Sequence, residues 1–136
     1  MLDLYDHIQD AVTAIGSRFN RRPHAGMILG TGLGNITEQI EIDTIIDYEE
    51  IRFVVNSTTT SHRGRLVCGL LEGLPIIAME GRFHQYEGYL LRRITFPVRV
   101  MQALGAKLLL VSQAAGGMNP HYRAGDVMII EDHINL

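Results

Sequence analysis

Ala25-Gly26-Met27-Ile28-Leu29-Gly30-Thr31-Gly32-Leu33-Gly34 is the stretch of sequence that decides the fold class. Its first half is a short apolar run, and in its second half every other residue is glycine. This order predicts a buried strand over residues 25–29 that ends in a glycine turn, with a second helical piece beginning near Asn35. Ligands of open α/β sheets bind where such strands end, so the turn is also a candidate binding loop.

The segments on either side alternate between helical and strand patterns. Apolar residues at three- and four-residue spacing predict a helix over residues 2–20. A further helix is predicted over residues 90–104, with a kink or the start of its regular part at Pro97. Strands are predicted over residues 41–48, 65–71, 74–79, 107–111 and 127–130. The chain is therefore expected to have an α/β fold with a mixed β-sheet flanked by helices.

Three of these strands have distinctive features. Glu72-Gly73 separates residues 65–71 from residues 74–79 and has the length and chemistry of a two-residue hairpin turn. Residues 107–111 are apolar beyond Lys107 and show no alternation, which is typical of a strand buried on both faces. This strand leads into Ser112-Gln113-Ala114-Ala115-Gly116-Gly117, a second loop of small residues.

Length, composition and charge limit the classes of protein to which the chain can belong. The 136 residues fit one domain, given about 150 residues per domain, and 46% of them are hydrophobic, enough for a packed core. A net charge of −3 gives no electrostatic case for binding nucleic acid or a membrane. No signal peptide and no apolar stretch of roughly 18 residues is present, so we expect a cytoplasmic protein. Cys68, the single cysteine, is interpreted as a small buried hydrophobe in a reducing compartment.

The segment Gly81-Arg82-Phe83-His84-Gln85-Tyr86-Glu87-Gly88-Tyr89 carries the densest set of reactive side chains. Arg82 offers a planar fork of donors that suits phosphate, and His84 can donate a further hydrogen bond. Glu87 is close enough in sequence to orient that imidazole. The alternative is a solvated loop in which Arg82 and Glu87 pair across water.

Three other loops are candidate anion sites, each with a plain structural alternative. Thr31 adds a hydroxyl to the glycine turn, which is otherwise an ordinary strand-to-helix turn. His62 lies between Ser61 and Arg63 and can donate one bond to an anion, or it belongs to an exposed polar connection. Residues 113–117 supply backbone N–H groups and one amide side chain, or they form a tight turn that needs small residues.

Several other classes of site do not fit the sequence. The third glycine of a dinucleotide-binding loop would fall at Asn35, and the Gly-Lys-Ser/Thr ending of a P-loop is missing. No metal site is expected, because no cysteine or histidine cluster is present and four histidines lack partners at ligand spacing: His7, His24, His121 and His133. No G-x-S-x-G elbow is present, and no carboxylate pair stands out among the fifteen acidic residues.

Taken together and in order, these motifs resemble the trimeric class of purine nucleoside phosphorylases. The matching segments are residues 29–34, 62, 64–66, 81–84, 86–89, 95–100, 114–117, 125–126 and 132–135. The resemblance implies a nucleoside phosphorylase-like fold that is incomplete at the C-terminus, with residues 1–136 as the N-terminal part of a single domain. It implies an enzyme that cleaves a purine (deoxy)nucleoside with inorganic phosphate, giving the free base and (deoxy)ribose 1-phosphate.

The same resemblance assigns roles to individual residues. It implies a phosphate site made by Thr31, His62, Arg82, His84 and the backbone at Ala114. Tyr86 and Gln113 would contact the nucleoside, and His84 held by Glu87 would be the catalytic pair. No cofactor is expected besides phosphate as co-substrate, and the implied assembly of the full-length protein is a homotrimer.

The chain also departs from the family pattern. Thr31 and Gln113 stand where serine and asparagine are usual, and Ser61 and Arg63 replace smaller residues beside His62. The groups that grip the purine are expected in sequence beyond Leu136, so we expect little activity from these residues alone. A non-catalytic phosphate-binding remnant, or a subunit fragment that joins mixed trimers, is the alternative.

Overall fold

The structure is a computed structural model that describes residues 2–30, 32–52, 54 and 64–134. Its elements, in chain order, are α1 (Leu2–Gly16), β1 (Ala25–Leu29), η1 (Gly34–Gln39), β2 (Glu41–Asp47), η2 (Tyr48–Glu50), β3 (Arg65–Leu71), β4 (Leu74–Glu80), η3 (Gln85–Glu87), α2 (Leu91–Ile94), α3 (Phe96–Leu104) and β5 (Leu108–Val111), where η marks a 3₁₀ helix. Helices and strands alternate along most of the chain, as the sequence predicts.

The five strands form one mixed sheet in the order β2-β3-β4-β1-β5. β2, β3 and β4 pair antiparallel, whereas β4, β1 and β5 run parallel. The predicted hairpin between β3 and β4 is confirmed, and its turn residues Glu72 and Gly73 have φ angles of 50° and 75°. Positive φ at both positions matches the twist of the two strands.

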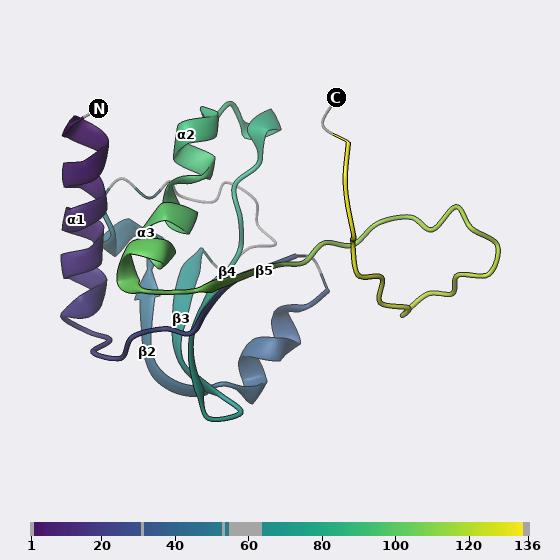
Figure 1. Cartoon of the computed structure of the whole chain (residues 1–136), viewed down its shortest axis with the longest axis horizontal. Helices are drawn as coiled ribbons and strands as arrows, with labels where there is room; N and C mark the ends of the chain where they lie inside the picture. The colour runs from purple at the N-terminus through teal and green to yellow at the C-terminus, as the bar shows by residue number, and fades with distance from the viewer. Residues whose placement is uncertain (1, 31, 53, 55–63, 135–136) are drawn as a thin grey trace.

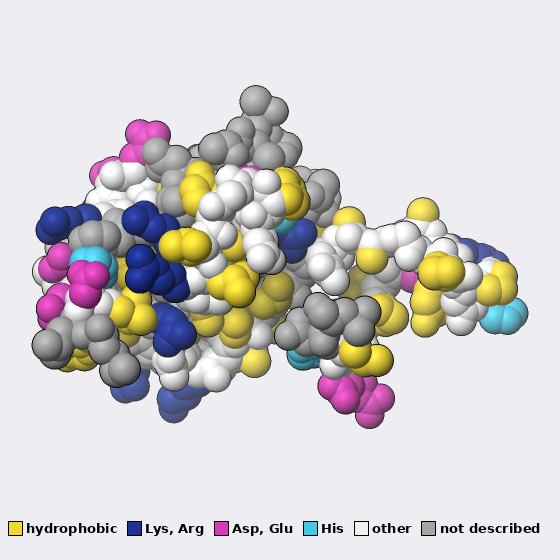
Figure 2. All heavy atoms as spheres, turned by 90° about the horizontal axis from the view of Figure 1, so that it is seen from above, with side chains coloured by type: hydrophobic (Ala, Val, Ile, Leu, Met, Phe, Trp, Pro, Cys, Tyr) yellow, Lys and Arg dark blue, Asp and Glu magenta, His cyan; other side chains and the backbone are white. Residues whose placement is uncertain are grey.

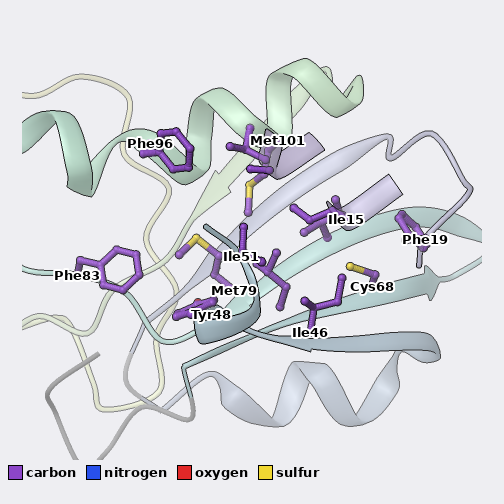
Figure 3. Close-up of a cluster of buried hydrophobic side chains, with 14 residues drawn as sticks. Ile15, Phe19, Ile46, Tyr48, Ile51, Cys68, Met79, Phe83, Phe96 and Met101 are labelled. Carbon is purple, nitrogen blue, oxygen red and sulfur yellow. The ribbon is translucent and has the colours of Figure 1, made fainter. Parts of the chain in front are cut away.

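The sheet has a layer on each face (Figure 1). α1 and α3 pack together over one face, where Ile15, Cys68 and Met101 belong to the larger cluster of buried side chains. Figure 3 shows these side chains pointing toward one another between the helices and the sheet. η1 covers the other face, above a smaller cluster that contains Met27 and Val67. The predicted α/β fold with helices flanking a mixed sheet is thereby confirmed.

Two predicted helices have different bounds. α1 ends at Gly16 rather than at residue 20, since glycine destabilises a helix, although Phe19 is still buried. The predicted helix over residues 90–104 is two helices that meet at Thr95. Pro97 lies in the first turn of α3, where its missing N–H breaks no helical hydrogen bond.

The prediction that β5 is buried on both faces is wrong. Its four residues are between 40% and 61% exposed. The apolar run does form a strand, but β5 lies at the edge of the sheet and pairs on one side only, with β1. Burial of a strand depends on what covers it, and a local sequence pattern cannot report that.

The predicted strand over residues 127–130 is also absent, although those residues are within the described part of the chain. Beyond β5 the chain leaves the body of the molecule as a projecting segment, residues 113–134 (Figure 1). Viewed from above, this segment stands apart and displays hydrophobic side chains (Figure 2). Val127 and Ile129 are each 91% exposed. A strand needs a neighbour to satisfy its backbone hydrogen bonds, and this segment runs away from the sheet.

Cys68 is buried in β3, as predicted, and this burial raises the pKa of its thiol to about 12, with a smaller contribution from the charge of Asp43. Because the folded pKa lies above the ordinary value, stability contributed by the neutral thiol is present below about pH 9 and is lost as the pH rises toward 12.

We therefore expect iodoacetamide at pH 9 to modify Cys68 far more slowly in the native chain than in the chain unfolded in urea, since the thiolate is the reactive form. Mass spectrometry of timed samples measures both rates. Equal rates would show that the thiol is accessible and ionised in the folded state.

Candidate functional site

The carboxyl ends of the three parallel strands meet at one edge of the sheet. Gly30 follows β1, Arg82 follows β4 by two residues, and Ser112 follows β5. The backbone N–H of Gly30 donates to Ser112 Oγ at 3.0 Å, and the N–H of Ser112 donates to the carbonyl of Ile28 at 3.0 Å. These bonds fix the start of two predicted anion loops against each other.

Position 30 requires glycine because the backbone at the end of β5 approaches it closely. A Cβ atom at Gly30 would lie 2.4 Å from the carbonyl oxygen of Ser112 and 2.8 Å from Cα of Gln113. Both distances are shorter than van der Waals contact, and both partners are backbone atoms that cannot swing away. The glycine turn therefore has a packing role where it meets the end of β5.

Arg82 lies at this edge, after β4, and is half-buried. Its Nε–H donates to Nε2 of His84 at 3.2 Å, and its Nη1 donates to the carbonyl oxygen of Ser112 at 3.3 Å. Arg65, the other half-buried arginine in the described part of the chain, pairs with Glu80. Arg82 pairs with none of the described carboxylates, so its positive charge is available to an anion.

His84 lies between Arg82 and Glu87. Nδ1 of His84 is 2.8 Å from Oε1 of Glu87, and the backbone N–H of His84 donates to the same oxygen at 2.9 Å. The side chain of Glu87 is only 4% exposed. Nδ1 of His84 thus faces a carboxylate, and Nε2 faces the Nε–H of Arg82.

The remaining candidates lie around this cluster or outside the described residues. The ring of Tyr86 stacks on that of His84, with centroids 4.7 Å apart and an angle of 18°, and Tyr86 is 78% exposed. Gln113 and Ala114 are exposed at the beginning of the projecting segment. Thr31 and His62 lie outside the residues that the structure describes.

The structure also brings in residues that the sequence did not single out. Ser112 binds the backbone of β1 and accepts from Arg82. Glu80, the last residue of β4, binds Thr37 and Arg65. The sequence offered two signals: Ser112 is a hydroxyl residue directly after an apolar strand, and Glu80 is a lone acid at the end of another. The partners of both residues are distant in sequence.

The described residues offer neither a metal centre nor a membrane-spanning helix. Over that part of the chain, no three side chains of histidine, cysteine, aspartate or glutamate gather as a metal centre would require. Within the same residues, none of the helices combines the length and the hydropathy needed to cross a bilayer.

Comparison with known proteins agrees with the geometry. Residues 24–136 match the family model described as "Phosphorylase superfamily". The chain is 51% identical over 131 residues to "Purine nucleoside phosphorylase 1" of Bacillus subtilis, covering 96% of this chain and 48% of that protein. It is 45% identical over 132 residues to "Purine nucleoside phosphorylase" of Bos taurus, covering 97% of this chain and 46% of that protein.

A solved structure shows the same fold. Isoform 2 of purine nucleoside phosphorylase from Schistosoma mansoni, in complex with cytosine and ribose-1-phosphate, matches with a TM-score of 0.82 at 40% identity, covering 90% of this chain and 43% of that one. The chain thus spans about half the length of the relatives it matches. By sequence and by fold, the chain belongs to the phosphorylase superfamily, and the relatives it matches there are purine nucleoside phosphorylases.

Proposed function

We propose that this chain provides the phosphate-binding part of a purine nucleoside phosphorylase. The reaction would cleave the glycosidic bond of a purine (deoxy)nucleoside with inorganic phosphate and yield the base and (deoxy)ribose 1-phosphate. The observation that carries the proposal is Arg82, a half-buried guanidinium that pairs with none of the described carboxylates, at the edge where three strands end. The names of the matched relatives supply the reaction class.

In this proposal the guanidinium of Arg82 binds the phosphate with its planar fork of N–H donors. The other phosphate ligands would be Thr31, His62, His84 and the backbone at Ala114. Bound phosphate would then face the anomeric carbon while positive charge builds on the sugar ring. Catalysis would rest on positioning and on electrostatic stabilisation of separated charge.

His84 and Glu87 would act together at this site. Glu87 holds the imidazole through Nδ1, so that Nε2 faces Arg82. In the arrangement of the structure, Nε2 accepts a hydrogen bond from the Nε–H of Arg82, so His84 orients the guanidinium. To donate to phosphate through Nε2, the imidazole would need its proton on that nitrogen, and the Nε–H of Arg82 would have to release it. Tyr86 and Gln113 would border the nucleoside.

The wider assembly is also part of the proposal. The resemblance to the trimeric class supports a homotrimer for the whole protein. A cytoplasmic location fits the free, buried thiol of Cys68.

The alternative function is a phosphate-binding remnant without catalysis, and a chimera separates the two. Residues 1–136 would replace the aligned part of the Bacillus subtilis relative, which is 51% identical over 131 residues. We expect a folded chimera to cleave inosine in a phosphate-dependent reaction, and Arg82→Ala in the chimera to abolish that turnover. A folded chimera that binds phosphate but does not cleave inosine would favour the remnant.

The 136-residue chain by itself is expected to show no useful inosine turnover. Tyr86 and Gln113, the proposed nucleoside contacts, are exposed, so a nucleoside held between them would stay open to water. A coupled assay for released hypoxanthine, with and without phosphate, measures this. Substantial phosphate-dependent turnover by the purified chain would contradict the expectation.

A further inference from the structure

Glu80 is a buried carboxylate directly before the loop that bears Arg82. It is the last residue of β4, only 8% exposed, and Gly81 and Arg82 follow it directly. Acidic side chains are rarely buried unless they are paired, so the environment of Glu80 needs an explanation.

Both carboxylate oxygens of Glu80 accept hydrogen bonds from other segments. The hydroxyl of Thr37 donates to Oε1 at 2.6 Å, and Nε–H of Arg65 donates to Oε2. Thr37 is itself buried and belongs to η1, the element that follows the glycine turn after β1. Arg65 begins β3, the strand entered from the segment that holds His62.

The backbone around Glu80 is fixed by separate bonds. The N–H of Gly64 donates to the carbonyl of Glu80 at 3.0 Å, and the hydroxyl of Tyr48 donates to the carbonyl of Gly81 at 2.7 Å. These bonds hold β4 to β3 and η2. The side chain of Glu80 adds the link from the end of β4 to η1, across the face of the sheet.

The charge of Glu80 is balanced within the cluster. A bare carboxylate this close to Arg82 in sequence would oppose the binding of an anion, but Arg65 pairs with it. The pair is formally neutral, which leaves the charge of Arg82 for the ligand. The contacts of Glu80 therefore suit a connecting role better than an electrostatic one.

We propose that Glu80 is a positioning residue that holds η1 and the start of β3 in register with the loop bearing Arg82, through hydrogen-bond geometry rather than through its charge. The effect of Glu80 on phosphate affinity rests on the proposed function, whereas the coupling between these segments does not. Three variants test it in the 136-residue chain: Glu80→Gln, Glu80→Ala and Thr37→Val.

The variants separate geometry from charge. In Glu80→Gln, the amide oxygen can accept from Arg65 while the NH₂ group donates to the Thr37 oxygen, so both contacts persist without the charge. Glu80→Ala removes both contacts. Thr37→Val keeps the shape of residue 37 but removes the hydrogen bond from η1 to Glu80. This variant still tests the proposal if Glu80→Ala fails to fold.

Hydrogen–deuterium exchange without phosphate is the first measurement. We expect the amides of residues 32–37 to exchange at least about tenfold faster in Glu80→Ala and Thr37→Val, from the loss of a buried hydrogen bond, and at the native rate in Glu80→Gln. Native rates in Thr37→Val would overturn the proposal. Equal acceleration in Glu80→Gln and Glu80→Ala would also overturn it, because charge would then be the active property.

Phosphate titration by calorimetry is the second measurement. We expect affinity about tenfold weaker in Glu80→Ala and Thr37→Val than in Glu80→Gln. Native affinity in a Thr37→Val variant would overturn the role of Glu80 in the site. If the unaltered chain binds no phosphate, the proposed function fails, and the exchange rates alone decide whether Glu80 couples the loops.

Discussion

Replacing Arg82 by alanine is expected to weaken phosphate binding by at least about a hundredfold. A guanidinium can bind phosphate through two parallel charge-assisted hydrogen bonds, each contributing about 1.5–3 kcal/mol, and 1.4 kcal/mol corresponds to a factor of ten. The fold should tolerate the change, because Arg82 is half-buried and its two donor bonds, at 3.2 and 3.3 Å, are long. Calorimetric titration of the folded variant with inorganic phosphate measures the loss.

Arg99→Ala is the matched control. Arg99 is an exposed arginine on α3, outside the edge where β1, β4 and β5 end, so its removal changes the net charge by the same amount. We expect native phosphate affinity in this variant. If both variants lost affinity equally, phosphate binding would reflect overall charge, and the role given to Arg82 would be wrong.

Replacing Gly30 by alanine is expected to produce a large loss of stability. The added methyl group would lie 2.4 Å from the carbonyl oxygen of Ser112, so β1 and the end of β5 would have to separate. Overpacking of this kind costs about 1–3 kcal/mol. The displacement would also pull Ser112 away from Arg82, so weaker phosphate binding should accompany it. Urea unfolding followed by circular dichroism measures the free energy of unfolding.

Gly116→Ala provides the comparison for this substitution. Gly116 lies in the exposed segment after β5, and a Cβ atom there would have no atom within 4 Å. We expect its free energy of unfolding to match that of the unaltered chain within about 0.5 kcal/mol. Equal stability of the Gly30 and Gly116 variants would mean that the close contact between β1 and Ser112 does not exist in solution.

The sheet was predictable from sequence where local chemistry determines it. The turn at Glu72-Gly73 fixes the β3–β4 hairpin, because both residues adopt positive φ. The apolar run of residues 25–29 ends in glycine and forms β1 with the predicted bounds. Each of these features depends on neighbours in the chain, and such features can be recognised in a single sequence.

The errors arose where the outcome depends on distant parts of the chain. Residues 108–111 form a strand as predicted, but whether its faces are buried depends on layers that the pattern cannot describe. Residues 127–130 have a strand-like composition, but none of the strands in the described part of the chain pairs with them. For residues 108–111 the strand was predicted correctly and its burial was not, whereas for residues 127–130 the strand prediction itself was wrong.

In the candidate site, too, contacts between residues close in sequence were predictable, and contacts between distant residues were not. The loop with Arg82, His84 and Glu87 was recognisable because its residues are adjacent in sequence, and the structure brings these three into contact. The bonds that join this loop to others span much longer separations. Gly30 and Ser112 are 82 residues apart, and Thr37 and Glu80 are 43 apart. Only the sheet topology brings such pairs together, so the connecting roles of Ser112 and Glu80 required the structure.

The central claim is that the loops after β1, β4 and β5 together form one phosphate site. The most direct test is a titration of the ¹⁵N-labelled chain with inorganic phosphate, followed by two-dimensional NMR. We predict that the amides of Gly30, Arg82 and Ala114 shift along a single saturable curve with one dissociation constant. Shifts that do not saturate, or that occur at the exposed arginines of α2 and not at these three amides, would contradict the account.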